Sequence, residues 1–162
     1  MTGIQLARQI KPDATVIGPS DSGDFYDPAC DAIRLSEATW YGSTPEDLAH
    51  AAHECGHAIQ RHAETWTWRA WRLLPITSPL WWVFVAASSV AGILGDMGRA
   101  WAFAAVAICL SALRYLVVLA LEREASVLAL REMTGLQAKG PTIDLLRVRT
   151  ALRRNLKTYA VR

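Results

Sequence analysis

The sequence predicts a mainly helical protein with a small β-hairpin or sheet and an inserted transmembrane helical hairpin. Two observations predict the helices: a well-capped segment over 45–63, and two long apolar segments over 73–95 and 100–121. A third observation, a set of short alternating segments between residues 14 and 35, predicts the strands. A length of 162 residues fits one domain, or one domain with an appendage.

The first forty residues are expected to form a short helix followed by a few strands. Residues 2–10 predict an amphipathic helix that Thr2 caps and a nearby proline stops. Residues 14–17 predict a strand, and residues 25–35 predict a hairpin with an Asp-Pro turn. The returning half of this hairpin, "AIRL", is either an edge strand that pairs with an extended substrate backbone or an ordinary sheet strand.

The segment over 45–63 carries the strongest helix signals in the chain. Thr44 is a capping residue, Pro45 occupies the first helical position, and two acids fill the first turn. Gly56 is the only weak point of the predicted helix.

The two apolar segments predict a membrane hairpin. Segment 73–95 contains no charged residue, and segment 100–121 contains only Arg114. Each is long enough, at about 1.5 Å per residue, to cross a hydrocarbon core of about 30 Å. A short turn over 95–98 joins them, and a mean hydropathy of +0.15 supports the prediction. The alternative is a buried hairpin of a soluble protein. Arg114 either reaches the headgroups or forms a paired charge near a site.

The chain beyond the hairpin is expected to return to the side of the membrane that it left. The second helix continues past residue 121, and Thr142 opens a final basic amphipathic helix. Residues 1–72 and 122–162 are therefore predicted to form one domain, into which the hairpin 73–121 is inserted.

The distribution of basic residues predicts the orientation. Of the 17 lysines and arginines, all except Arg99 and Arg114 lie outside the hairpin. The positive-inside rule then places the predicted domain in the cytoplasm.

The composition excludes several classes of protein. A net charge of +2 gives no indication of nucleic acid binding. The three cysteines are widely spaced and odd in number, so they predict a reducing compartment rather than a disulfide framework. The N-terminus shows no apolar region of a cleavable signal peptide.

All four histidines lie in one short stretch of the predicted helix, "HAAHECGHAIQRH". His53 and His57 are one turn apart, so both imidazoles point to the same place, as in a helix that binds Zn²⁺. Glu54 lies about 100° round the helix from His53. From there its carboxylate can act as a general base on a zinc-activated water during peptide-bond hydrolysis, and then as a general acid.

A catalytic zinc site needs a third protein ligand. A histidine six positions after His57 would complete one common pattern, but that position is Ala63. A carboxylate from the helix after the hairpin is the other common solution, and the candidates there are Glu122, Glu124 and Glu132. Glu122 is the first charged residue after the apolar segment and is the preferred ligand. Glu124 would point about 200° away on the same helix, so only one of these two can face the metal.

The sequence also resembles a known family. The stretch "YDPACDAIRLSEATWYGSTPEDLAHAAHECGHAIQRHAE", the opening "TGIQLAR" and the late "EREAS" are similar to bacterial membrane-bound neutral zinc metallopeptidases of the YugP type. The resemblance extends over most of the chain.

The resemblance implies a zincin-like helical metallopeptidase domain in the bacterial inner membrane, with its active site facing the cytoplasm. It implies that His53, His57 and Glu122 ligate zinc as in the gluzincins, that Glu54 is catalytic, and that Ser126 supports the ligands. Partner subunits, including those of a homo-oligomer, could supply the flanking membrane segments that members of this family usually carry.

Other roles are compatible with the same residues. His50, one turn before His53, is either a surface residue, a support for the ligands, or a fourth ligand that closes a structural site. The alternative function is therefore a non-catalytic zinc-stabilised membrane scaffold or a regulatory binding protein. For an enzyme, the expected partners are peptide or protein substrates, including membrane proteins, and the lipid bilayer. Arg123, Tyr26 and Tyr41 are candidates for stabilising the oxyanion.

Overall fold

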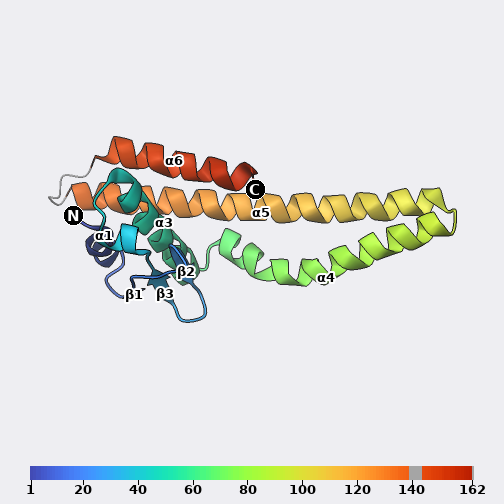
Figure 1. Ribbon diagram of the computed structural model, residues 1–162, viewed down its shortest axis with the longest axis horizontal. Helices are drawn as coiled ribbons and strands as arrows, with labels where there is room; N and C mark the ends of the chain where they lie inside the picture. Colours follow the sequence, from blue (N-terminus) through green and yellow to red (C-terminus); the bar gives the residue numbers. More distant parts are fainter. Residues whose placement is uncertain (139–143, 162) are drawn as a thin grey trace. The chain divides into compact units, whose positions relative to one another are not determined.

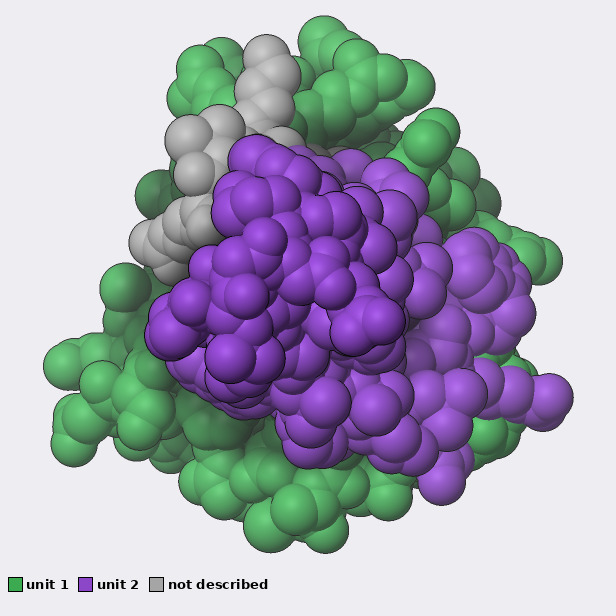
Figure 2. Space-filling view, turned by 90° about the vertical axis from the view of Figure 1, so that its right-hand side faces the viewer, with its two compact units in different colours: residues 1–65, 122–162 green, residues 66–121 purple. Residues whose placement is uncertain are grey.

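The computed structural model describes residues 1–138 and 144–161, and side chains up to residue 154. Helices account for 74% of the chain, so the predicted mainly helical class with a small sheet is confirmed. The chain divides into two compact units (Figures 1 and 2). One consists of Met1–Thr65 and Glu122–Arg162, and the other of Trp66–Leu121.

A three-stranded sheet lies in the first unit. Its strands are β1 (Thr15–Ile17), β2 (Phe25–Asp27) and β3 (Ala32–Arg34), in the order β1-β3-β2. Strands β2 and β3 form the predicted antiparallel hairpin, with Tyr26 opposite Ile33. Of the two alternatives for β3, the ordinary sheet strand is confirmed and the edge strand is wrong, because β1 pairs with β3 in parallel on its other side. A parallel partner from earlier in the chain leaves no short-range signal in the hairpin itself.

Two short helices pack near this sheet. Helix α1 (Gly3–Ile10) begins after the predicted capping residue Thr2, whose backbone N–H donates to Gln5 Oε1 at 2.9 Å, and it buries an apolar face against the unit. Helix α2 (Glu37–Tyr41) was not predicted, because five residues are too few to show a periodic pattern. Asp24 stabilises its start by accepting hydrogen bonds from Ser36 N and Thr39 Oγ1, both at 2.7 Å.

Helix α3 (Pro45–His62) is the central helix of the first unit. Thr44 caps it and Pro45 begins it, as the sequence predicts, and in the structure Thr44 and Asp47 form a capping box. The helix contacts α1, α2, β2 and β3, and it also contacts α6 (Leu145–Val161). Alanines on several of its faces are fully buried, so neighbouring elements can approach its backbone closely.

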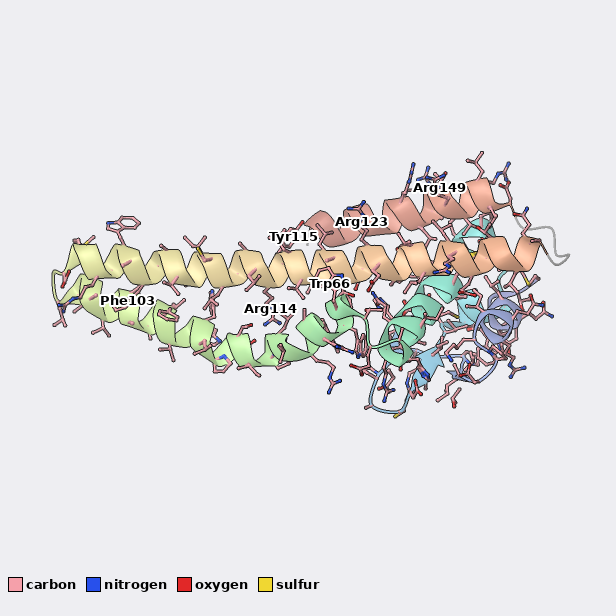
Figure 3. All side chains as sticks on the ribbon, turned by 180° about the vertical axis from the view of Figure 1, so that it is seen from behind. Trp66, Phe103, Arg114, Tyr115, Arg123 and Arg149 are labelled. Atoms are coloured by element: carbon pink, nitrogen blue, oxygen red, sulfur yellow. The ribbon has the colours of Figure 1, made fainter. Side chains whose placement is uncertain are left out.

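The last part of helix α5 (Met97–Gln137) belongs to the same unit, where α6 runs beside it (Figure 1). Ala125, Ala129 and Met133 are fully buried at intervals of one turn on α5. Among the side chains of α6 that the structure describes, Val148, Ala151 and Leu152 are buried, whereas Arg149 projects outward (Figure 3). The predicted start of the final helix at Thr142 lies outside the described residues.

The second unit contains helix α4 (Trp66–Ile93) and the first part of α5. Gly95, at φ 80°, makes the tight turn between them. Both helices are long and apolar enough to cross a membrane, and only 6% and 11% of their most apolar windows are buried. A core helix of a soluble protein would be mostly buried. Arg114 lies within this unit and donates to Ser78 Oγ at 2.6 Å (Figure 3).

Candidate metal centre

Three side chains of the first unit converge on one point. His53 and His57 lie one turn apart on α3, and Glu122 lies on α5 just past its apolar part. Glu122 Oε2 is 2.9 Å from His53 Nε2 and 3.6 Å from His57 Nε2. The three potential ligand atoms all lie within 4.8 Å of one another. Residues separated by 69 positions in the sequence thus form one cluster.

The donor set fits a catalytic zinc ion. Two imidazole nitrogens and one carboxylate oxygen are a common three-ligand set, which leaves one position for water or substrate. Ligands about 2.0–2.2 Å from a tetrahedral zinc lie roughly 3.4 Å from one another. The two separations that involve Glu122, 2.9 and 3.6 Å, bracket that value, and all three potential ligand atoms lie within 4.8 Å of one another. Among the described residues, the group consists of His53, His57 and Glu122.

The site is largely shielded from solvent. His53 is 4% exposed, and the side chains of His57 and Glu122 are 13% and 12% exposed. Burial acts to raise the pKa of Glu122, but hydrogen bonds from both histidines outweigh it and lower the pKa to about 2. Glu122 is therefore a carboxylate at neutral pH, as a metal ligand must be.

Glu54 is a buried acid beside the three converging side chains. It is only 6% exposed, and burial raises its pKa, although the two histidines partly offset this effect. Its carboxylate accepts a hydrogen bond from the backbone N–H of Tyr26 on β2. The sheet thus orients the one acid of α3 that lies next to the cluster.

A second set of polar groups lies behind the two imidazoles. His53 Nδ1 is 3.2 Å from Ser126 Oγ, and His57 Nδ1 is 2.9 Å from Gln60 Oε1. These contacts leave both Nε2 atoms facing Glu122. Sequence reasoning identified Ser126 but missed Gln60, although its position three residues after His57 places it on the same helix face.

The close approach of α3 and α5 brings these groups together. A Cβ atom built on Gly56 would lie 2.8 Å from the carbonyl carbon of Ala125 and 3.0 Å from its Cα. Glu122 and Ser126 flank Ala125 on α5, so the absence of a side chain at Gly56 sets how near they come to the histidines. The apparent weak point of the predicted helix is thus a packing requirement.

Replacing Gly56 by alanine should destabilise the protein. In an exposed helix this change usually stabilises by about 1 kcal/mol. Here the clash with backbone atoms dominates, and we expect G56A to lower the free energy of unfolding by about 1–3 kcal/mol. Thermal unfolding followed by circular dichroism measures the effect. In the control G92A, the added Cβ meets no heavy atom within 4 Å, so stability should not fall. A G56A variant as stable as the wild type would contradict the close approach.

The remaining predicted residues lie outside the cluster. His50 is half-buried one turn before His53, and His62 contacts Asp31 at 3.0 Å. The hydroxyl of Tyr26 donates to Asp31 at 2.5 Å, so the backbone of this residue, not its side chain, reaches Glu54. The side chains of Tyr41 and Arg123 are exposed to solvent (Arg123 is labelled in Figure 3).

Glu124 does not face the cluster. Its carboxylate accepts hydrogen bonds from Gln60 and Thr65, both at 2.8 Å. The expectation that Glu122 and Glu124 point in different directions is thus confirmed by their contacts.

Comparison with known proteins identifies the family to which this chain is similar. The whole chain, residues 1–162, matches the family described as "Putative neutral zinc metallopeptidase". It is also similar to "Putative membrane protease YugP" of Bacillus subtilis (strain 168), with 44% identity over 43 residues. That match covers 26% of this chain and 19%, about a fifth, of the relative. No solved structure shows a match to this chain. Because the family match extends over every residue, the chain belongs to the neutral zinc metallopeptidase family.

Proposed function

We propose that this chain is a membrane-associated, zincin-like metallopeptidase that hydrolyses peptide bonds. His53, His57 and Glu122 hold one zinc ion, and Glu54 is the general base and acid. The observation that carries the proposal is the convergence of two Nε2 atoms and one carboxylate oxygen, beside a buried acid, in a member of a zinc peptidase family.

A zinc ion bound there would polarise the scissile carbonyl and activate a water molecule by lowering its pKa toward about 7. Glu54 accepts the proton of the attacking water and then donates it to the leaving amine. The Tyr26 backbone N–H holds the Glu54 carboxylate in place. Ser126 holds His53 from behind, so that its Nε2 faces the cluster.

The site supports an enzyme better than a structural zinc site. A structural site is normally closed by a fourth protein ligand. Among the described residues, the cluster contains three such groups, and His50 is not one of them. A role for His50 behind the ligands stays a prediction.

We also propose where the chain acts. Residues 1–72 and 122–162 form a cytoplasmic peptidase domain at the bacterial inner membrane, and residues 73–121 span the bilayer as a hairpin. Two helices of spanning length and the concentration of basic residues outside the hairpin support this arrangement. Peptides or proteins, including membrane proteins, are the substrates.

Metal analysis of the purified full chain tests the function. We expect about one zinc per chain, because the donor set provides one site. The protein should cleave an unstructured substrate such as casein. A chelator should abolish cleavage, and added zinc should restore it. A wild-type protein that binds no zinc would overturn the proposal.

A reporter tag tests the orientation. A tag inserted in the turn at Gly95 should lie on the far side of the membrane, whereas a tag at the N-terminus should lie in the cytoplasm. Protease accessibility in spheroplasts and inverted vesicles measures both. A turn tag on the cytoplasmic side would contradict the proposed orientation.

A further inference from the structure

Gln60 is the most deeply buried polar side chain next to the metal centre. It is 0% exposed, and burying an amide without hydrogen bonds is costly. Its Oε1 lies 2.9 Å from His57 Nδ1, and its Nε2 donates to Glu124 Oε2 at 2.8 Å. A series of hydrogen bonds therefore connects the carboxylate of Glu124 on α5, the amide of Gln60 on α3, and Nδ1 of His57.

The donors and acceptors in this series of hydrogen bonds can be assigned. Gln60 Nε2 and Thr65 Oγ1 both donate to the same carboxylate oxygen, Glu124 Oε2, each at 2.8 Å. The amide of Gln60 must therefore turn its NH₂ group toward Glu124 and its carbonyl oxygen toward His57. A carbonyl oxygen is an acceptor, so His57 Nδ1 must carry a proton. In the neutral imidazole, the lone pair is then on Nε2, which faces Glu122.

We infer that Gln60 and Glu124 are positioning residues that hold His57 in the tautomer and orientation required to bind a metal ion. The inference rests on the proposed function and extends it beyond the three ligands. Among the described residues, neither is a member of the converging group, so both act on the metal centre through His57.

The spacing on α5 explains why the amide is needed. Glu122 and Glu124 are two residues apart, about 200° round the helix, so they cannot approach the same imidazole from the same side. Glu122 takes the metal-facing side of the cluster. Glu124 reaches the opposite side of His57 only through the amide of Gln60. His53 has a simpler support, the neutral hydroxyl of Ser126.

Removing the polar groups of Gln60 while keeping its shape tests the inference. In the full chain purified in detergent, Q60M should weaken zinc affinity by about 10–100-fold, the usual cost of losing a partner behind a ligand. Competition with a chromophoric chelator measures this affinity. The absorption band of the Co²⁺-loaded protein should also shift, because His57 is no longer held in place.

A polarity exchange separates positioning from simple packing. The double variant Q60E/E124Q exchanges the acid and the amide. The carboxylate at position 60 can still accept a hydrogen bond from His57, and the amide at position 124 can donate one to that carboxylate. Its zinc affinity should lie within about twofold of the wild type. The control E132Q removes one negative charge from α5 about 12 Å further along the helix and should change nothing. If Q60M does not fold, E124M provides the same test, because it removes the carboxylate that accepts the hydrogen bond from Gln60.

Two results would overturn the inference alone: Q60M or E124M binding zinc as tightly as the wild type, or Q60E/E124Q binding as weakly as Q60M. In both cases the wild type still binds zinc, so the proposed function stands. A wild type that binds no zinc overturns the proposed function, and the inference with it.

Discussion

Replacing Glu54 by glutamine should lower kcat/KM for a fluorogenic casein substrate by about 10²–10⁴-fold, the usual contribution of a general acid–base group. The E54Q side chain keeps its size and can still accept a hydrogen bond from the Tyr26 backbone, but it can no longer accept a proton from water. Zinc content should stay at the wild-type level, because Glu54 is not a member of the converging group. Folding should not suffer, since a neutral amide avoids the cost of burying a charge.

The matched control for this variant is E46Q. Glu46 lies in the first turn of the same helix and is exposed, so the substitution makes the same change of charge far from the cluster. Its kcat/KM should equal that of the wild type. An E54Q protein with full activity would refute the proposed mechanism. An E54Q protein that loses zinc would instead identify Glu54 as a ligand.

Replacing Glu122 by alanine should cause the largest loss of metal binding. Removing a direct ligand should cost more than the 10–100-fold typical of the residues behind it, so we expect zinc affinity to fall by more than about 100-fold. The two histidines would also lose the carboxylate that lies 2.9 and 3.6 Å from their Nε2 atoms. Chelator competition and the metal content after dialysis measure the loss, and peptidase activity should fall with the metal.

The control E132A removes a different carboxylate from the same helix. Glu132 was a candidate ligand on sequence grounds, but it lies outside the converging group. E132A should bind zinc as the wild type does. Unchanged zinc affinity in E122A would show that the third ligand is another residue. If only E132A lost zinc affinity, Glu132 would be the third ligand instead of Glu122.

The local features of α3 were predictable because they depend on neighbouring residues. The cap at Thr44, the proline that begins the helix and the one-turn spacing of His53 and His57 all follow from helix geometry. The two long apolar helices were predictable for a similar reason, since length and hydropathy are local properties. Helix α2 was missed because a contact from Asp24, twelve or more residues away, stabilises it.

Sequence reasoning could only partly describe the surroundings of the cluster. It favoured Glu122 over Glu124 and Glu132 from its position after the apolar segment. Which carboxylate faces the histidines depends, however, on how α5 is rotated and how closely it approaches α3 at Gly56. The same packing brings Gln60 to Glu124, 64 positions later in the chain. No local pattern contains such a contact.

The sequence by itself determined the helical class, the two spanning-length helices, and a helix that presents two histidines and one acid at zinc-site spacing. These features arise within one or two helical turns, where backbone geometry alone relates the residues. Only the tertiary structure decided that Glu122 meets both imidazoles, that the backbone of Tyr26 holds Glu54, and that Gln60 and Ser126 support the rings. Each of these contacts joins distant segments, and its geometry depends on packing distances of a few tenths of an ångström.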